Sequence, residues 1–123
     1  MAEGILKSFD SQLNVLSAGT KPEKHVNPLA IEVMKEIGID ISTSKAENVV
    51  KYINQSFDHV ITVCDNAKES CPIFIGNVKN LIHIGFQDPA AASGTHDEII
   101  ITYRRIRDEI IEKFTQFYNL IKN

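Results

Sequence analysis

The two cysteines of this chain lie seven positions apart, within the stretch VITVCDNAKESCPIF that begins at Val60. Cys64 follows a run of apolar and β-branched residues, and Cys71 stands directly before Pro72. In a chain without a secretory signal, a close cysteine pair is more typical of catalysis, redox chemistry or metal binding than of a structural disulfide. Two cysteines do not complete a four-ligand zinc site, and the histidines lack zinc-finger spacing. For Cys64 alone a second interpretation stays open, because a cysteine that ends a buried strand is often only a small apolar residue.

A second candidate for chemistry is Asp88, in the sequence GFQDP. It follows an apolar run, as Cys64 ends one, and reactive groups in parallel sheets gather at the carboxyl ends of the strands. A carboxylic acid there protonates a leaving oxygen if its pKa is raised. The alternative is that Asp-Pro merely starts a turn. His59 and His83 are interpreted as residues on strand faces rather than as ligands.

The elements that position these residues alternate between strands and helices. The runs HVITVC and LIHIGF are continuous apolar stretches, typical of parallel strands covered on both faces. Asn27 and Pro28 form a helix start and Gly38 a helix stop. We predict helices at residues 2–9, 28–37, 46–53 (capped by Thr43 or Ser44) and 99–121, and strands at 13–16, 59–64 and 81–86. This order predicts an α/β fold with a mostly parallel sheet flanked by helices.

Two of the predicted helices have a clear apolar face. In the second helix this face holds Ala30, Val33, Met34 and Ile37. In the last helix it holds Ile99, Tyr103, Ile106, Ile110, Phe114, Phe117 and Ile121. The opposite face of the last helix, with Arg104, Arg107, Asp108, Glu112 and Lys113, is predicted to be solvated.

Composition and charge limit the partners. The 123 residues make one domain, residues 1–123. The net charge is −3 without a basic block, so neither nucleic acid nor an anionic membrane surface is expected as a partner. No run approaches the roughly 20 apolar residues of a membrane helix, and the first ten residues lack the layout of a secretory signal. A cytoplasmic protein is expected.

Several motifs occur in one order along the whole chain: MAEG, SAGT, HVNPLAI, VITVC, Cys64-x6-Cys71-Pro72 and GFQDP. Together they resemble the thioredoxin-coupled arsenate reductases, which share the fold of the low-molecular-weight protein tyrosine phosphatases. The resemblance implies reduction of arsenate to arsenite by a relay of three cysteines. Cys64 stands where the second cysteine belongs and Cys71 where the third belongs, and Asp88 stands at the place of the general acid. A thioredoxin-like reductant and a small oxyanion, arsenate or phosphate-like, are the partners that it implies.

The spacing of the pair suits a relay that ends in a Cys64–Cys71 disulfide. Seven helical residues span about 10.5 Å, whereas the Cα atoms of a disulfide lie roughly 4.4–6.8 Å apart. If residues 65–70 are helical, the bond therefore forms only when they unwind. The intervening residues are mostly polar, and Pro72 disfavours a helical backbone at Cys71. We therefore hypothesise a redox-switched segment that carries the disulfide towards the surface.

Members of this family begin with a further strand and a loop of pattern C-x5-R-S, directly before the segment that matches Met1. The loop supplies the nucleophilic cysteine and holds the oxyanion, and the strand lies in the middle of the sheet. This sequence contains no C-x5-R, so we expect the first, central strand to be missing and the chain as given not to turn over arsenate. Either Met1 is an internal residue of a longer protein, or the chain is a truncated relative without catalysis. The strands beside the gap are expected to rearrange or to pair with another copy in a homo-oligomer.

Some members of the family hold a potassium ion with side chains that match Glu3, Ser17 and Glu47, and oxygen ligands suit such an ion. Here Glu47 replaces the usual aspartate, and the ligand from the loop is absent. Two rival functions stay open. A phosphotyrosine phosphatase would have an aromatic residue after Asp-Pro, where this chain has Ala90, and no cysteine pair. A non-catalytic module would use Cys64 and Cys71 as a redox sensor.

Overall fold

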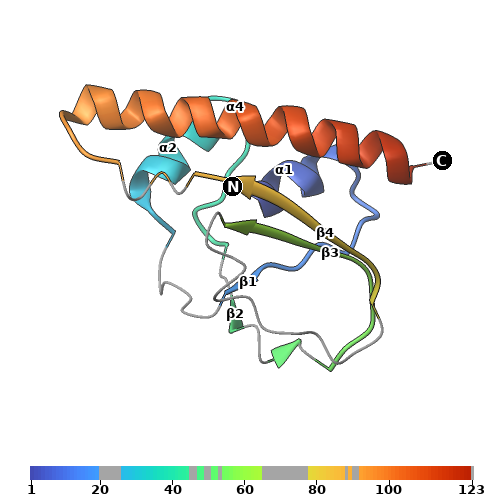
Figure 1. Ribbon diagram of the computed structural model, residues 1–123. Coiled ribbons are helices and arrows are strands. Elements are labelled where there is room, and N and C mark those ends of the chain that lie inside the picture. Colours follow the sequence, from blue (N-terminus) through green and yellow to red (C-terminus); the bar gives the residue numbers. More distant parts are fainter. Residues whose placement is uncertain are drawn as a thin grey trace.

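The computed structural model describes residues 1–19, 26–44, 47–48, 51–52, 54–64, 78–87, 89 and 92–122 (Figure 1). Three helices and four strands are defined within these residues. In chain order they are α1 (Ala2–Phe9), β1 (Ala18–Gly19), α2 (Pro28–Lys35), β2 (Glu47–Asn48), β3 (Phe57–Cys64), β4 (Val78–Phe86) and α4 (His96–Ile121).

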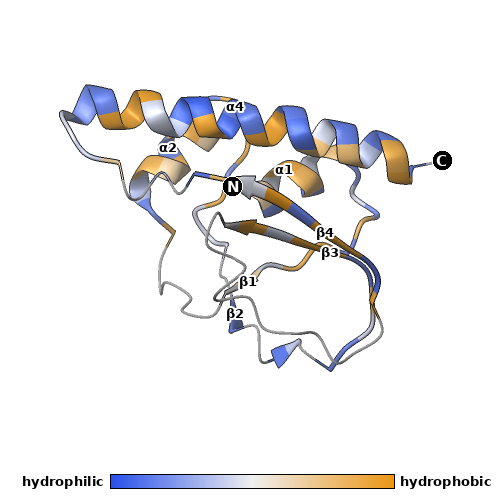
Figure 2. Cartoon of the chain, in the orientation of Figure 1, coloured by the Kyte–Doolittle hydropathy of each residue, from blue (hydrophilic) through white to orange (hydrophobic). Residues whose placement is uncertain are grey.

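The long helix α4 lies along one side of the molecule and contributes nearly half of the buried apolar residues. It starts after Thr95, whose Oγ1 accepts a hydrogen bond from the backbone N–H of Glu98 at 3.2 Å, as expected for a capping residue. Figure 2 shows apolar and polar residues alternating along it, which is the pattern of a helix with one apolar face. The predicted face is confirmed in its centre, and the helix begins three residues earlier than predicted. Its buried residues are Ile100, Tyr103, Ile106, Arg107, Ile110, Phe114 and Phe117.

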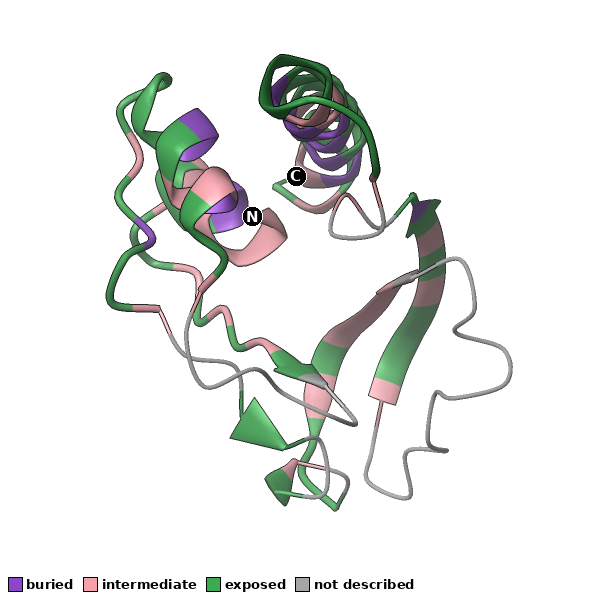
Figure 3. Cartoon of the chain, turned by 90° about the vertical axis from the view of Figure 1, so that its left-hand side faces the viewer, coloured by how far each residue is buried: buried purple, intermediate pink, exposed green. Residues whose placement is uncertain are grey.

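The short helices α1 and α2 both pack against α4, and Figure 3 shows buried residues on the sides where these helices face one another. In α2 the Asn27 side chain caps the helix by accepting from the backbone N–H of Leu29 at 2.8 Å. Gly38 follows the helix with a φ of 81°, a left-handed backbone that suits glycine. Both signals were predicted from the sequence. Burial of Val33 and Met34, each fully inaccessible to solvent, then fixes α2 against α4.

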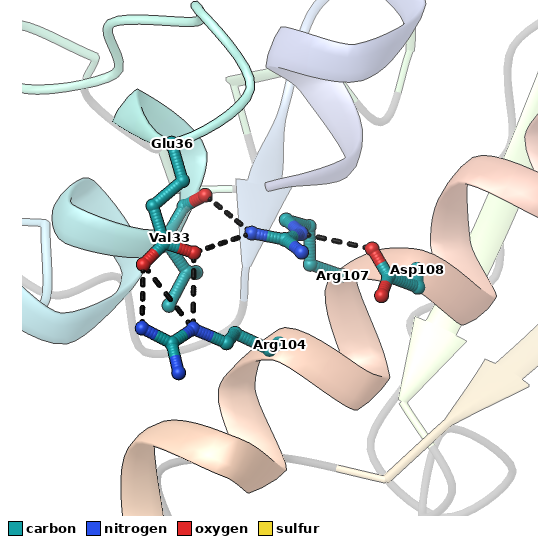
Figure 4. Close-up of polar contacts among 5 residues, drawn as sticks. All are labelled: Val33, Glu36, Arg104, Arg107 and Asp108. Atoms are coloured by element: carbon teal, nitrogen blue, oxygen red, sulfur yellow. Dashed lines mark hydrogen bonds and ion pairs between the residues drawn. The ribbon is translucent and has the colours of Figure 1, made fainter.

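Two predictions about these helix faces were wrong. Ile37 lies in the turn after α2 and is exposed, because the helix ends at Lys35 and the apolar face ends with it. Arg107 was predicted on a solvated face, but only 9% of it is exposed. Figure 4 shows the reason: its Nη1 donates to the backbone oxygen of Val33 and to a Glu36 carboxylate oxygen, both at 2.8 Å. The guanidinium therefore supplies hydrogen-bond donors to the acceptors at the end of α2.

Glu36 connects this buried arginine to an exposed one. Arg104 donates to its carboxylate through Nε and Nη2, at 2.7 Å for the shortest contact. The Arg104 hydrogen bond is the main cause that lowers the pKa of Glu36, with Arg107 adding to the effect against a smaller cost of desolvation. The Arg107 guanidinium also donates to Asp108 at 2.9 Å. These contacts join the end of α2 to the middle of α4.

The strands β3 and β4 form a parallel pair, as predicted. The register places Val60 opposite Leu81 and Thr62 opposite His83, with an irregularity before Cys64, which lies opposite Phe86. One face of the pair packs on the core through Ile61, Val63, Ile82 and Ile84. The other face was expected to be covered as well, but Leu81 is 71% exposed. The pair therefore has one face on the core, which explains the alternating burial along β4.

The remaining strands differ from the prediction. A strand was predicted at residues 13–16 and a helix at 46–53, but β1 is Ala18–Gly19 and β2 is Glu47–Asn48, and these two pair in parallel. The chain reaches a ladder partner only at Ala18, so the apolar residues before it make no strand among the described residues. β1–β2 and β3–β4 form two separate pairs within the described part of the chain. Both pairs are parallel and helices flank them, which confirms the predicted α/β class.

Candidate functional site

The carboxyl ends of β3 and β4 lie side by side at the place where chemistry was expected. Cys64 is the last residue of β3, and its Cα pairs with that of Phe86, the last residue of β4. Asp88 follows Phe86 by two positions in the sequence. Asp88 and Cys71 both lie outside the described residues, as does the segment predicted to unwind. The register therefore brings the backbone of Cys64 to the strand that leads to Asp88.

The peptide before Asp88 is held by α4. Arg105 donates through Nη2 to the Gln87 side-chain oxygen at 2.9 Å, and through Nη1 to Glu109 at 3.2 Å. Phe86 is buried and stacks on Phe114, with ring centroids 6.1 Å apart. A pocket of about 400 Å³ lies here and is lined by residues of β4 and α4, among them Phe86 and Arg105, and by Gln87 directly after β4. The contact between Arg105 and Gln87 was not predicted from the sequence. The one signal for it was the polar residue Gln87 directly before Asp-Pro.

The histidines of the two strands behave as face residues. The ring of His59 stands edge-on to Phe117, with centroids 5.3 Å apart. Its Nδ1 is buried and has no hydrogen-bond partner within the described residues. His83 Nδ1 lies 2.6 Å from Thr62 Oγ1 on the exposed face. No group of three or more His, Cys, Asp or Glu side chains that could hold a metal ion occurs in the described part of the chain.

The three residues considered for potassium come together in a second pocket. Glu3 of α1, Ser17 before β1 and Glu47 of β2 all line one cavity of about 320 Å³. The position of Glu47 depends on β1–β2 pairing, since its backbone N–H donates to the backbone carbonyl oxygen of Ser17 at 3.3 Å. The remaining lining residues, which sequence reasoning did not assign to this pocket, are Lys7, Val15, Leu16, Thr43, Ser44 and Tyr52.

The donors in this pocket fit a monovalent cation by type. Carboxylate and hydroxyl oxygens are hard ligands, and the lining offers two carboxylates together with the hydroxyls of Ser17, Thr43 and Ser44. Sulfur and imidazole, which favour zinc or copper, are absent from the residues that line it. Each carboxylate also has a lysine four positions later: Lys7 Nζ lies 3.8 Å from Glu3, and Lys51 Nζ lies 3.7 Å from Glu47.

Proteins with similar sequences include several that are named arsenate reductase. The chain is 43% identical over 119 residues to the arsenate reductase of Halalkalibacterium halodurans, a match that covers 95% of this chain and 84% of that protein. It is 40% identical over 119 residues to the arsenate reductase of Bacillus subtilis (strain 168), with the same coverage. None of the described helices is long and apolar enough to cross a membrane.

Solved structures give the same result for the fold. The structure of an arsenate reductase in an oxidized state superposes with a TM-score of 0.74 at 26% identity, over 91% of this chain and 80% of that one. An arsenate reductase in a reduced state gives a TM-score of 0.71 at 23% identity, over 98% of this chain and 86% of that one. Residues 1–123 match the family described as low molecular weight phosphotyrosine protein phosphatase. With its parallel strands, flanking helices and these relatives, the chain belongs to the low molecular weight phosphotyrosine protein phosphatase family.

Proposed function

We propose that this chain is an arsenate reductase-like thiol redox protein in which Cys64 and Cys71 are the second and third thiols of a cysteine relay. The observation that carries the proposal is the match to proteins named arsenate reductase over 95% of the chain, at 43% identity. The cysteine pair supports it, because Cys64 ends β3 at the carboxyl edge of the parallel strands, where such folds bind ligands. The solved arsenate reductase in an oxidized state, which is 26% identical to this chain, supports a redox role.

The relay needs three thiols. A nucleophilic cysteine thiolate displaces an oxygen of arsenate as water and forms a sulfur–arsenic(V) bond. The Cys64 thiolate attacks that sulfur, the electron pair of the bond passes to arsenic, and arsenite leaves. Cys71 then attacks Cys64, the nucleophile leaves as a thiolate, and a Cys64–Cys71 disulfide remains. Two electrons reach arsenic and two thiols become one disulfide, which a thioredoxin-like dithiol of the cytoplasm reduces.

Asp88 acts in this proposal as the acid that protonates the departing oxygen. Arg105 supports that role from α4, because it holds Gln87, the residue directly before Asp88. The first thiol and the arginine that binds the oxyanion belong to a C-x5-R-S loop that this sequence does not contain. The chain as given is therefore proposed to form its disulfide without turning over arsenate.

The test is a thiol titration before and after mild oxidation. We expect two free thiols per chain when reduced, none after oxidation, no change in molecular mass beyond the loss of two hydrogens, and recovery of both thiols with thioredoxin and its reductase. The variants Cys64→Ser and Cys71→Ser each keep one thiol and serve as matched controls. If the oxidised protein keeps two titratable thiols, or loses them only in disulfide-linked dimers, the relay has no physical basis.

A second candidate function, a non-catalytic redox module, is favoured by the absence of C-x5-R from the sequence. A version of the chain preceded by the family's strand and C-x5-R-S loop separates the two. Arsenite release with thioredoxin supports the reductase, whereas an extended protein that cycles its disulfide but leaves arsenate unchanged supports the sensor. Hydrolysis of an aryl phosphate by the same version would instead indicate a phosphatase, which Ala90 and the cysteine pair argue against.

The proposal extends to a potassium ion held by Glu3, Ser17 and Glu47. Its support is the common pocket and the oxygen donors of these residues. A ligand that binds the folded state and not the unfolded state stabilises it by RT ln(1 + [L]/Kd), so the melting temperature rises with the ligand concentration. We expect KCl to raise the melting temperature more than tetramethylammonium chloride does at equal ionic strength, and Glu3→Gln to remove this difference. Equal effects of the two salts on the parent chain would show that the pocket binds no potassium.

A further inference from the structure

Lys7 places an ammonium group at the pocket that contains Glu3, Ser17 and Glu47. It lines the same cavity as these residues, and its Nζ lies 3.8 Å from the Glu3 carboxylate, one helical turn away on α1. The two side chains differ in burial, since 15% of Glu3 but 54% of Lys7 is exposed. Glu3 is therefore the fixed partner, and Lys7 reaches the carboxylate from solvent.

The second carboxylate of the pocket has a different arrangement. Glu47 is paired with Lys51 at 3.7 Å, and about half of each side chain is exposed. Lys51 does not line the cavity, and its Nζ lies over the Tyr52 ring, 5.6 Å from the centroid. Within the described lining, Lys7 is the basic residue that shares the cavity with both carboxylates.

We propose that Lys7 is an internal counter-ion of this pocket and competes with a monovalent cation for Glu3, so that it sets how tightly the cation binds. The inference rests on the proposed potassium site and adds a residue that controls it. A cation held by Glu3 would lie within a few ångströms of the lysine ammonium, and like charges at that distance repel. The ion pair of an exposed lysine is weak, so a cation can displace it.

The size of the effect follows from the charge that is removed. The repulsion between two like unit charges about 4 Å apart in a medium like water weakens a binding constant by about fivefold. Replacing Lys7 by a neutral residue is therefore expected to lower the potassium concentration at half-saturation by about fivefold. A conservative Lys7→Arg change keeps the charge and is expected to keep the half-saturation of the parent.

The experiment measures the melting temperature as KCl replaces tetramethylammonium chloride at constant ionic strength. The variants are Lys7→Gln, Lys7→Arg and Lys79→Gln. Lys79 is the matched control because it also pairs with an exposed carboxylate, that of Asp58 at 3.4 Å, but belongs to β4 and lies outside the pocket. We expect Lys7→Gln to respond at about one fifth of the potassium concentration that the parent needs, and Lys79→Gln to respond like the parent.

The outcomes separate the two proposals. If the parent responds to potassium and Lys7→Gln responds at the same concentration, the competition is disproved and the cation site stands. If neither protein responds, the cation site and the role of Lys7 are both disproved. A response of Lys7→Arg that matches Lys7→Gln would show that charge is not the cause, and this also overturns the inference.

Discussion

Arg107 shows how a charged residue becomes part of the core when its donors have fixed acceptors. Its guanidinium contacts the Val33 carbonyl at the end of α2, the Glu36 carboxylate and Asp108. Burial opposes the charge of this group, but the hydrogen bonds with Asp108 and Glu36 outweigh it and raise the pKa of Arg107. The side chain thus bridges two helices whose residues lie more than 70 positions apart in the sequence.

Replacing Arg107 by alanine should destabilise the protein clearly more than replacing its neighbour Arg104. Loss of Arg107 leaves a buried carbonyl without a donor, which costs about 2 kcal/mol. Arg104 is about half exposed and pairs with Glu36 at the surface, so its loss should cost less than about 1 kcal/mol. Urea unfolding of Arg107→Ala and Arg104→Ala measures both. Equal losses would mean that the ion pair with Glu36, common to both residues, matters and the carbonyl contact does not.

Glu36 gives a pH dependence with a definite sign. Its pKa is lowered in the folded protein, chiefly by the Arg104 hydrogen bond. A lowered folded pKa adds stability above the unfolded pKa of a glutamate, about 4.3, and this contribution is lost as pH falls through the folded value. The stability difference between the parent and Glu36→Gln should therefore be full at pH 6 and shrink towards pH 3. Urea midpoints across this range measure it, and a difference that does not change with pH would contradict the assignment.

Among the elements, α4 has the clearest start signal, and its cap can be tested with a matched pair of threonines. Thr95 Oγ1 accepts from the Glu98 backbone N–H, whereas Thr115 Oγ1 donates to the Ile111 carbonyl within the helix. Thr95→Ala removes a capping acceptor and should cost about 1 kcal/mol. Thr115→Ala replaces a β-branched residue by a better helix former and should be neutral or stabilising. Helical circular dichroism followed through urea unfolding compares the two, and a larger loss for Thr115→Ala would refute the role of the cap.

The elements that the sequence predicted are those with local causes. Asn27 caps the start of α2 with its side chain, and Gly38 follows the end of α2 with a left-handed backbone. The apolar period of α4 likewise needs no partner to be recognised. The strand β2 was missed because two residues, Glu47 and Asn48, become a strand through pairing with Ala18 and Gly19. That pairing is a tertiary contact, and it overrides the helix propensity of the segment.

The candidate sites divide in the same way. Cys64 was placed correctly at the end of a strand, because its apolar run is a local signal. The grouping of Glu3, Ser17 and Glu47 in one pocket was expected from the family resemblance, whereas the residues alone gave no sign of it, since they come from three elements. Lys7 and Arg105 were missed because their partners are defined by side-chain geometry. The partner of Lys7 is Glu3, one turn away on α1, and the partner of Arg105 is Gln87, directly after β4.

At the scale of the whole molecule, the strands that the structure describes form two separate pairs. Within the described residues, β4 is the hydrogen-bonded neighbour of β3 and lies on one of its edges. The strands β1 and β2 pair with each other over two residues. A two-stranded pair is marginal unless other elements cover it, and here α4 and its neighbours supply that cover on one face (Figure 1).

This arrangement predicts that copies of the chain associate through sheet edges. Strand edges without a hydrogen-bonded neighbour recruit further strands. From Asp58 to Val63, β3 pairs with β4 alone among the described residues, and Asp58 is the one charged residue there, which leaves little charge to prevent pairing. Sedimentation at increasing protein concentration should show a mass that rises above the monomer, and hydrogen exchange should slow in β3 but not in β4 over the same range. The variant Leu81→Lys adds charge to the exposed face, away from the edge, and should leave both results unchanged. Loss of association in Leu81→Lys would show that the copies contact each other through the exposed face that holds Leu81. If the protein is a monomer at every concentration and exchange in β3 does not change, the edge of β3 already has its hydrogen-bond partners within one chain.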